Sequence, residues 1–442
     1  MPLPAFGSHT LRAFSLWRRP LFQPNFNRQF SQNVVARGFL RRSRRLRQEV
    51  VQSKAALKEK SDPLVGQELT FYEKIGKPGI TKQIIFVTAT SFLVFTFAAA
   101  QTTVETEYWT ERMKAVSPVW SLKSITNTDL KRAQNVQLIQ SLREKLASIQ
   151  TTVQQLPVLI RPWMNLAFVS VMQPYADASE GKRLCWKICL LNATIYAAWK
   201  VKRWEPFMSR NFMHYPLSGR SHTLLTSMFS HRTALHLLFN CLALESFGSA
   251  AYYYLLREQN KAEAHILEST TAYHFLGFFI SAGLFSGLVS HIVNAKFRYP
   301  RLVAQLASSV NTTRKTETWA SAVAATTASA AQATTKKKVL DILPSLGASG
   351  AIYAAVTMTA LAFPDSQVAL FIPPTYPINI QYGVGGLVLM DMIGVMRGWR
   401  VFDHWAHLGG AAFGVLYYKY GPQWWRFLRE STEDGDETDS KT

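Results

Sequence analysis

Apolar residues gather into seven runs along this chain, and polar segments separate them. The first run, residues 84–100, has seventeen residues and no charge (IIFVTATSFLVFTFAAA). As a helix it would reach about 25 Å, enough to cross the hydrocarbon core of a bilayer. Six more runs follow at about residues 184–199, 231–256, 273–293, 349–363, 380–396 and 405–420. The pattern predicts an all-α membrane protein with seven spans, one leading helix and a group of six.

The six later runs predict one packed bundle. Several are short, and several contain Lys, Asn, Ser or His. A helix surrounded by lipid tolerates such residues badly, because their polar groups find no partner in hydrocarbon. Neighbouring helices can supply partners, so we expect residues 184–420 to form a single domain.

The polar segments predict connections and not further domains. Residues 101–183 predict a polar helical linker, with helical periodicity over 128–155 and a more apolar patch at 159–172, and nothing there indicates a site. Residues 294–342 are rich in Ala, Thr, Ser and Lys and predict a mobile loop with some helix. Residues 421–442 end in an acidic tail.

Positive charge is concentrated at the N-terminus. The chain carries 49 Lys and Arg against 28 Asp and Glu, a net charge of +21. An Arg-rich N-terminus without acidic residues predicts a mitochondrial presequence over residues 1–48, cleaved near Arg37, before a basic-polar segment over 49–83. A basic arm for nucleic acid is the alternative, but the hydrophobic spans favour the presequence and we expect no nucleic-acid partner. Ten arginines precede the first acidic residue, Glu49: Arg12, Arg18, Arg19, Arg28, Arg37, Arg41, Arg42, Arg44, Arg45 and Arg47.

Loop charges predict the orientation in the mitochondrial inner membrane. With the N-terminus in the matrix, the loops after the first, third and fifth of the six later runs face the matrix and carry fifteen basic residues. The short loops on the other side carry only Arg257 and Lys261. Because positive charge prefers the side from which a span is inserted, we expect the C-terminus in the intermembrane space.

The three cysteines, Cys185, Cys189 and Cys241, form no CxxC pair and lie in apolar helical sequence. Small buried hydrophobic residues are the usual interpretation of such cysteines. Neither a disulfide framework nor a zinc site is indicated, and we expect no metal and no cofactor.

A serine lies at the start of the fourth run, in the sequence GASGAIY from Gly347 to Tyr353. Ser349 opens a helical run and shares a face with Tyr353, while Gly347 and Gly350 permit a bend and a close approach. A hydroxyl in a bilayer is expensive and usually functional, so a nucleophile is one interpretation. A serine bonded to a carbonyl of its own helix is the alternative, which this motif alone favours.

A histidine in the last run is a candidate general base. His407 shares a face with Gly410 and Gly414, a stripe of small residues that allows close helix packing. His404 lies one turn earlier on nearly the same face, so periodicity leaves both histidines open. Asp403 places His404 nearer the headgroups, and depth therefore favours His407. A histidine bonded to a neighbouring helix is the alternative.

His236 and Asn240 lie four residues apart in the second run and therefore stack on one helical face. Two neutral donors side by side in a dry environment are what a developing oxyanion needs. Hydrogen bonds between helices are the alternative role.

Together these motifs resemble the rhomboid family of intramembrane serine proteases. The resemblance covers roughly residues 184–420 and includes HxxxN in the second of the six runs, GxSG with a tyrosine four residues on in the fourth, and AHxxGxxxG in the sixth. The leading span and the presequence make the chain similar to the mitochondrial, presenilin-associated rhomboid-like subgroup, in a 1+6 arrangement. The insert at 294–342 departs from the compact family pattern.

The resemblance implies a role for each site residue. Ser349 would be the nucleophile and His407 the general base, with Tyr353 stacked on the His407 ring. His236, Asn240 and the Ser349 amide would stabilise the oxyanion. The family pattern implies a Ser-His dyad without an essential acid, and we expect no acidic residue near either motif and no intramembrane acidic site.

The resemblance also implies the reaction and the partners. The substrates would be transmembrane segments of single-span proteins in the bilayer, including an inner-membrane dynamin-like GTPase and presequence-bearing proteins of the intermembrane space. A catalytically inactive rhomboid-like binding protein is an alternative, although Ser349 and His407 are both present. A transporter is a further alternative, but the sequence shows no internal repeat.

Overall fold

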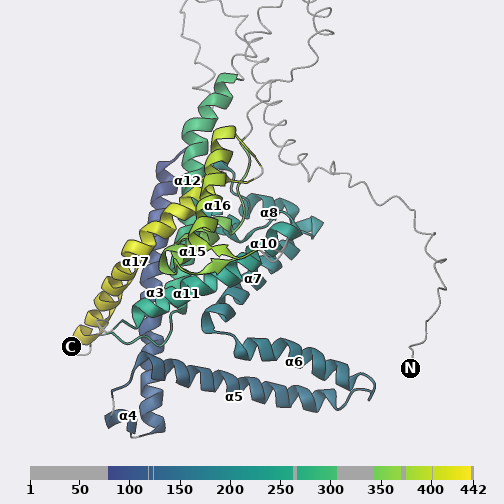
Figure 1. Ribbon diagram of the computed structural model, residues 1–442, viewed down its shortest axis with the longest axis vertical. Helices are drawn as coiled ribbons and strands as arrows, with labels where there is room; N and C mark the ends of the chain where they lie inside the picture. Colours follow the sequence, from purple (N-terminus) through teal and green to yellow (C-terminus); the bar gives the residue numbers. More distant parts are fainter. Residues whose placement is uncertain are drawn as a thin grey trace, which may run out of the picture. The chain divides into compact units, whose positions relative to one another are not determined.

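The computed structural model describes residues 78–117, 119–122, 124–261, 266–305, 342–369, 375–400 and 402–439 (Figure 1). The expected presequence, nearly all of segment 49–83 and most of the insert at 294–342 lie outside the described residues.

The described residues are mostly helical. The α-helices are α3 (Thr81–Val116), α4 (Val119–Leu122), α5 (Asn127–Val153), α6 (Arg161–Asp177), α7 (Glu180–Ala198), α8 (Glu205–Asn211), α9 (Thr223–Thr226), α10 (Ala234–Ala243), α11 (Ser249–Gln259), α12 (Ala272–Val293), α15 (Ser349–Ala362), α16 (Ile380–Arg397) and α17 (His404–Asp439). Short 3-10 helices are η1 (Lys202–Trp204), η2 (Pro216–Ser218) and η3 (Ser227–Phe229), and π-helical turns are η4 (Leu244–Gly248) and η5 (Asn294–Arg298).

Each apolar run of the sequence lies in a helix, but several helices are longer than their runs. Helix α3 continues to Val116 and so includes the first part of the expected linker, while α12 continues through η5 to Gln305, into the expected insert. Helix α17 continues through the expected tail to Asp439. Hydropathy locates the apolar part of a helix and not its ends, because polar residues can extend a helix beyond the lipid.

Three helices among the described residues are long and apolar enough to cross a membrane: Thr81–Val116, Ala234–Gln259 and Ala272–Gln305. The apolar helix α15 is shorter than these three. Charged residues lower the hydropathy of the other candidates, since α7 carries Lys182, Arg183 and Lys187. The seven-span arrangement therefore remains a proposal.

Within the part of the chain that the structure describes, one strand pair interrupts the helices. Strand β1 (Gln367–Val368) pairs antiparallel with β2 (Ile378–Asn379) in the loop between α15 and α16. The hairpin ends where α16 begins, and the Asn379 side chain caps that helix by accepting from the Gln381 amide at 2.8 Å.

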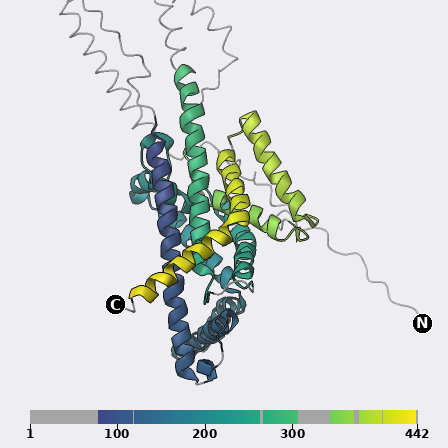
Figure 2. The ribbon, with the colours of Figure 1, turned by 90° about the vertical axis from the view of Figure 1, so that its left-hand side faces the viewer.

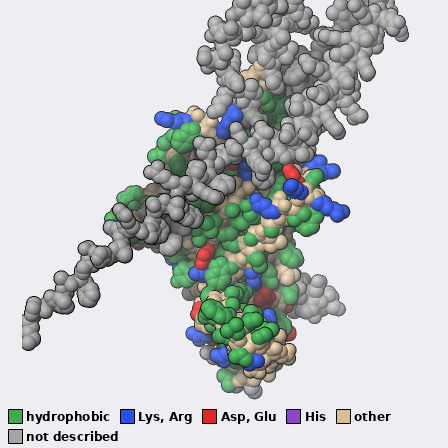
Figure 3. All heavy atoms as spheres, turned by 90° about the vertical axis from the view of Figure 1, so that its right-hand side faces the viewer, with side chains coloured by type: hydrophobic (Ala, Val, Ile, Leu, Met, Phe, Trp, Pro, Cys, Tyr) green, Lys and Arg blue, Asp and Glu red, His purple; other side chains and the backbone are tan. Residues whose placement is uncertain are grey.

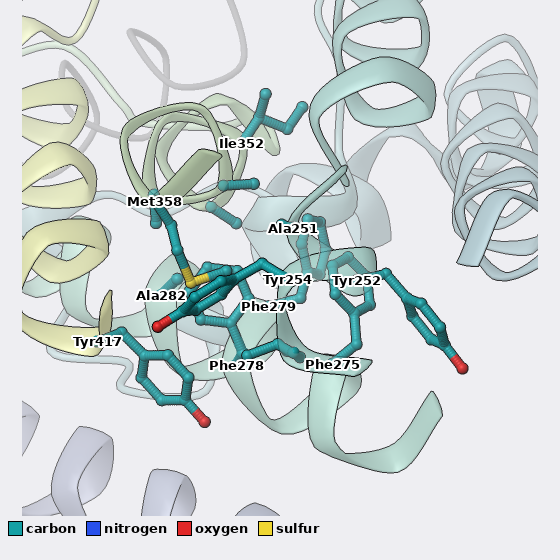
Figure 4. Packing of buried hydrophobic residues seen from close by; sticks show 14 of the residues in the cluster. Ala251, Tyr252, Tyr254, Phe275, Phe278, Phe279, Ala282, Ile352, Met358 and Tyr417 are labelled. Atoms are coloured by element: carbon teal, nitrogen blue, oxygen red, sulfur yellow. The ribbon is translucent and has the colours of Figure 1, made fainter. Parts of the chain in front are cut away.

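Helix α15 packs against α12, α16 and α17. Its buried residues join a core of aromatic and small side chains that includes Phe275, Phe278, Met358 and Tyr417 (Figure 4). The Phe278 and Tyr417 rings lie 4.9 Å apart, which joins α12 to α17. The core therefore surrounds the helix that begins at Ser349.

Helix α3 lies alongside α12 in both ribbon views (Figures 1 and 2). The Phe95 ring stacks on Tyr417 at 5.9 Å, so α3 contacts the bundle core directly. Near the other end of α17, the buried Arg429 guanidinium donates to the Ala99 carbonyl oxygen of α3 at 3.2 Å. These contacts attach the leading helix to the bundle and hold the extension of α17.

Hydrophobic side chains are also prominent on the outer surface (Figure 3). Helix α6 has no buried residue, and Trp163, Leu166 and Val171 are exposed along it. An apolar groove of about 750 Å³ lies between α5 and α6 and includes Phe168 and Trp186 among its lining residues. None of the candidate site residues lines this groove.

Candidate active site

The segment before Ser349 is fixed by backbone hydrogen bonds. Ser345 and His214 exchange two of them, at 2.9 and 3.0 Å, and the Gly347 amide donates to the Ser227 carbonyl oxygen at 3.0 Å. Gly347 has a φ of +126°, a conformation that favours glycine. These contacts lead the chain into α15 with Ser349 as its first residue.

Helices α15 and α17 approach each other through glycine. A Cβ at Gly410 would overlap the Gly350 carbonyl oxygen, and one turn further a Cβ at Gly414 would overlap the Ala354 carbonyl oxygen. A Cβ at Gly350 would in turn overlap Ser286 Oγ of α12. The small-residue stripe thus brings the backbones of two helices into contact, as the sequence predicted.

The start of α17 is anchored to α12. Asp403 caps the helix by accepting from the Ala406 amide at 3.3 Å, and Ser290 Oγ donates to the same carboxylate at 2.6 Å. Ser286 Oγ donates to the Ala406 carbonyl oxygen at 2.8 Å. The first turn of α17, which carries both candidate histidines, is therefore held at a fixed position over α15.

Ser349 and His407 are in hydrogen-bond contact. Ser349 Oγ lies 2.9 Å from His407 Nε2, although the two residues are 58 positions apart. The Tyr353 ring stacks on His407 with centroids 4.5 Å apart and an interplanar angle of 10°, as the resemblance implied. His407 is only 8% exposed, so the contact is largely shielded from solvent.

The expectation that no acidic residue lies near either motif is wrong. Asp391 of α16 is fully buried, and its Oδ1 lies 3.2 Å from His407 Nδ1 and 2.5 Å from His404 Nδ1. The sequence carried a signal for it, because Asp391 is the single acid in the run 380–396 and intramembrane acids are usually functional. Asp391 is distant from both motifs in sequence, and only the packing of α16 on α17 brings it to the histidines.

The two histidines are distinguished by their contacts. His407 reaches Ser349 through Nε2 and Asp391 through Nδ1, whereas His404 contacts Asp391 through Nδ1 and has no hydrogen-bond partner at Nε2 among the described residues. The His404 ring packs on Gly394, where a Cβ would lie 2.5 Å from it. His407 alone of the two is placed to exchange a proton with the serine.

The predicted oxyanion donors lie near Ser349 to different degrees. The His236 ring packs over Gly347, where a Cβ would lie 2.8 Å from His236 Cε1. Asn240 shares the helix but donates its amide at 2.7 Å to the His236 carbonyl oxygen. His236 therefore lies beside the segment that leads into the serine, while the Asn240 amide, which has two N–H donors, uses one of them for the His236 carbonyl oxygen.

Backbone amides at the start of α15 supply further donors. The first N–H groups of an α-helix have no partner within the helix, and here the first intrahelical bond after Ala348 is donated by Ile352. The amides of Ser349, Gly350 and Ala351 come before this bond and therefore have no acceptor within the helix. A negative charge that develops beside Ser349 would also be favoured by the helix dipole.

No cluster of His, Cys, Asp and Glu in the described ranges has the arrangement of a metal site. Cys185, Cys189 and Cys241 have free thiols. Cys189 Sγ lies 3.7 Å from the Cys241 carbonyl oxygen, where it packs α7 against α10.

The Rhomboid domain family model matches residues 218–423. The chain is 28% identical over 248 residues to presenilin-associated rhomboid-like protein A, mitochondrial, of Danio rerio. This alignment covers 56% of this chain and 50% of the relative. It is 28% identical over 247 residues to the Homo sapiens presenilin-associated rhomboid-like protein, mitochondrial, with 55% and 50% covered. Rhomboid protein 1, mitochondrial, of Saccharomyces cerevisiae is 25% identical over 239 residues, with 53% and 52% covered.

The aligned region spans about half the length of each of these relatives. No solved structure gives a significant match. The matched residues 218–423 contain Ser349, His407, His236, Asn240 and Asp391.

Proposed function

Because this chain carries a Rhomboid domain, we propose that it is an intramembrane serine endopeptidase that cleaves transmembrane segments of single-span proteins. The observation that carries the proposal is the 2.9 Å contact between Ser349 Oγ and His407 Nε2, in a position shielded from bulk water. Hydroxyl and imidazole at this distance form the activated nucleophile of covalent catalysis.

The reaction proceeds in two halves. Ser349 Oγ bonds to the scissile carbonyl carbon as its proton passes to His407 Nε2, and the carbonyl electron pair moves to oxygen. The tetrahedral intermediate then collapses, the C–N bond breaks, and the leaving amine takes the proton from His407. Water repeats the sequence on the acyl-enzyme and releases the second product.

The oxyanion would be stabilised by fixed donors around Ser349. The Ser349 amide lies at the free N-terminus of α15, and the His236 ring packs over Gly347 two residues earlier. Preorganised donors act strongly in a site that excludes water. We assign Asn240 to the same function, through the second N–H of the amide that donates to the His236 carbonyl oxygen.

The substrate segment would have to unwind before cleavage. In a helix the peptide groups are hydrogen-bonded and poorly exposed to attack, so helix-destabilising residues are expected near the scissile bond. Ser349 and His407 both lie in the first turns of their helices. Water for deacylation would therefore enter from the side on which α15 and α17 begin.

We place the chain in the mitochondrial inner membrane as a multi-pass protein. The relatives named above are mitochondrial, and the described apolar helices support a membrane location. We propose the 1+6 arrangement of seven spans, a presequence over residues 1–48, an N-terminus in the matrix and a C-terminus in the intermembrane space. The substrate class would include an inner-membrane dynamin-like GTPase and presequence-bearing proteins of the intermembrane space.

Purified protein incubated with a single-span substrate tests the proposal. The unaltered chain should cleave the substrate, while Ser349→Ala and His407→Ala should lose cleavage and keep the thermal stability of the fold. Cleavage that survives Ser349→Ala would show that another group is the nucleophile.

A further inference from the structure

The His407 ring lies between two oxygen atoms that belong to different helices. Ser349 Oγ of α15 contacts Nε2 at 2.9 Å, and Asp391 Oδ1 of α16 contacts Nδ1 at 3.2 Å. We propose that Asp391 is a positioning residue for His407 and completes a Ser349–His407–Asp391 relay. This inference rests on the proposed function and extends the expected dyad by one member.

The contact with Asp391 determines which nitrogen of His407 carries the proton. An ionised carboxylate can only accept hydrogen bonds, so the Nδ1 atom that faces it must be the protonated one. In neutral imidazole the other nitrogen, Nε2, then has a free lone pair directed at the Ser349 hydroxyl. This is the tautomer that a general base requires.

Asp391 would also act on the charge that forms during catalysis. His407 becomes positive when it takes the Ser349 proton, and the Asp391 carboxylate is 0% exposed beside it. Opposite charges attract more strongly where water does not screen them. The carboxylate therefore stabilises the imidazolium formed as Ser349 attacks, a state the resting enzyme does not contain.

His404 provides the competing explanation for a buried acid at this place. It contacts the same Oδ1 atom at 2.5 Å, a shorter distance than that of His407. The Tyr353 side chain of α15 faces the same carboxylate. If Asp391 served only to attach α16 to His404, replacing Asp391 and replacing His404 would lower kcat to the same extent.

The alignment of α16 with α17 supports the relay. Asp391 and Gly394 are three residues apart and lie on one face of α16, as His404 and His407 do on α17. The His404 ring lies against the Gly394 backbone, and this contact brings the Asp391 turn of α16 beside the first turn of α17. The close approach at Gly394 thus places the carboxylate within reach of His407.

The first arm of the test is spectroscopic and does not depend on proteolysis. The 15N spectrum of histidine-labelled protein, with the His407 signals assigned by their loss in His407→Ala, should show a protonated Nδ1 and an unprotonated Nε2 at neutral pH. Asp391→Leu, which has no acceptor, should lose this fixed tautomer. A wild-type His407 protonated at Nε2, or a spectrum unchanged in Asp391→Leu, would overturn the proposal.

The second arm measures cleavage in Asp391→Asn and in the matched control His404→Gln. Asp391→Asn should lower kcat by roughly 10³- to 10⁴-fold, the scale seen for the equivalent change in soluble serine proteases, and leave KM within about threefold. His404→Gln should lower kcat by less than about tenfold. Equal losses in both variants, or full turnover in Asp391→Asn, would show that the carboxylate serves only His404.

The two arms separate this inference from the proposed function. A wild-type protein that shows the expected His407 tautomer but no cleavage would refute the proposed protease activity and leave Asp391 as the residue that orients His407. A wild-type protein that cleaves but shows the other tautomer would refute the role of Asp391 alone.

Discussion

Gly410 of α17 lies directly against the Gly350 carbonyl oxygen of α15, with no room for a side chain between the two helices. Gly350 follows Ser349, and Gly410 lies one turn after His407. The contact between the two glycines therefore sets the separation of the helices at the turn where serine and histidine meet.

Gly410→Val tests this role of the helix contact. The added side chain would overlap the Gly350 backbone, and overpacking of this kind costs roughly 1–3 kcal/mol or more. We expect a lower unfolding temperature in detergent and a loss of cleavage. Gly386→Val is the matched control, because a Cβ at Gly386 of α16 would meet nothing within 4 Å. Equal behaviour of the two variants would contradict the packing assignment.

Gly347→Ala tests the segment that leads into the serine. Its φ of +126° would be strained for alanine, at roughly 1–3 kcal/mol, and the new methyl group would press on the His236 ring. The comparison is Gly219→Ala, which has a φ of +69° but open space around the position of its Cβ. Both variants should lose stability, while only Gly347→Ala should lose kcat. Unchanged kcat in Gly347→Ala would show that the position of the His236 ring is unimportant for catalysis.

Asn240→Ala should lower kcat by roughly 10²-fold, the scale for loss of one oxyanion donor, because the variant lacks the amide N–H that we assign to the oxyanion. The fold should remain intact, because the side chain donates only to the carbonyl of His236 in its own helix. The control is Asn192→Ala, which removes a buried asparagine from α7. Steady-state kinetics measure both variants, and an unchanged rate in Asn240→Ala would place the donor elsewhere.

His214 should make the stability of the fold sensitive to acid. Burial and the neighbouring His291 lower the pKa of His214 from 6.5 to about 3. The unfolded chain binds a proton at His214 below about pH 6.5 and the folded chain does not, so the stability held above pH 6.5 is lost as the pH falls toward 3. Over that range this histidine should cost the fold about 1.4 kcal/mol per pH unit.

Unfolding temperatures at pH 7.5 and pH 5 measure the effect of His214. His214→Gln should reduce the difference between the two values, whereas His222→Gln, at an exposed position, should leave it unchanged. The segment at risk is the one before the serine, because the His214 backbone exchanges hydrogen bonds with Ser345. The same pH dependence of the unfolding temperature in the unaltered protein, His214→Gln and His222→Gln would contradict the assignment to His214.

The sequence predicted the residues of the site better than the contacts between them. Ser349, His407 and Tyr353 each carry a local signal, and the small residues at 410 and 414 indicate a close helix contact. Asp391 was visible as a lone acid in an apolar run, but sequence periodicity does not say which neighbouring helix that acid faces. Its role depends on the contact of Gly394 with His404, which only the packing of the helices reveals.

The extent of the outer helices was less predictable for a different reason. Pro422 lies inside α17, although proline usually ends or kinks a helix. The helix continues because distant parts of the chain hold its second half, through Arg429 to the Ala99 carbonyl oxygen and through Trp425 to Glu268 at 2.9 Å. Contacts between residues this far apart in sequence leave no local signal.

The identity of the nucleophile is the central claim, and a covalent adduct tests it most directly. The protein is treated with a fluorophosphonate, and peptide mass mapping locates the modified residue. We predict one adduct on Ser349, absent in Ser349→Ala and formed far more slowly in His407→Ala. Ser349 would not be the nucleophile if the adduct formed at another residue while Ser349 stayed unmodified in a protein that cleaves its substrate.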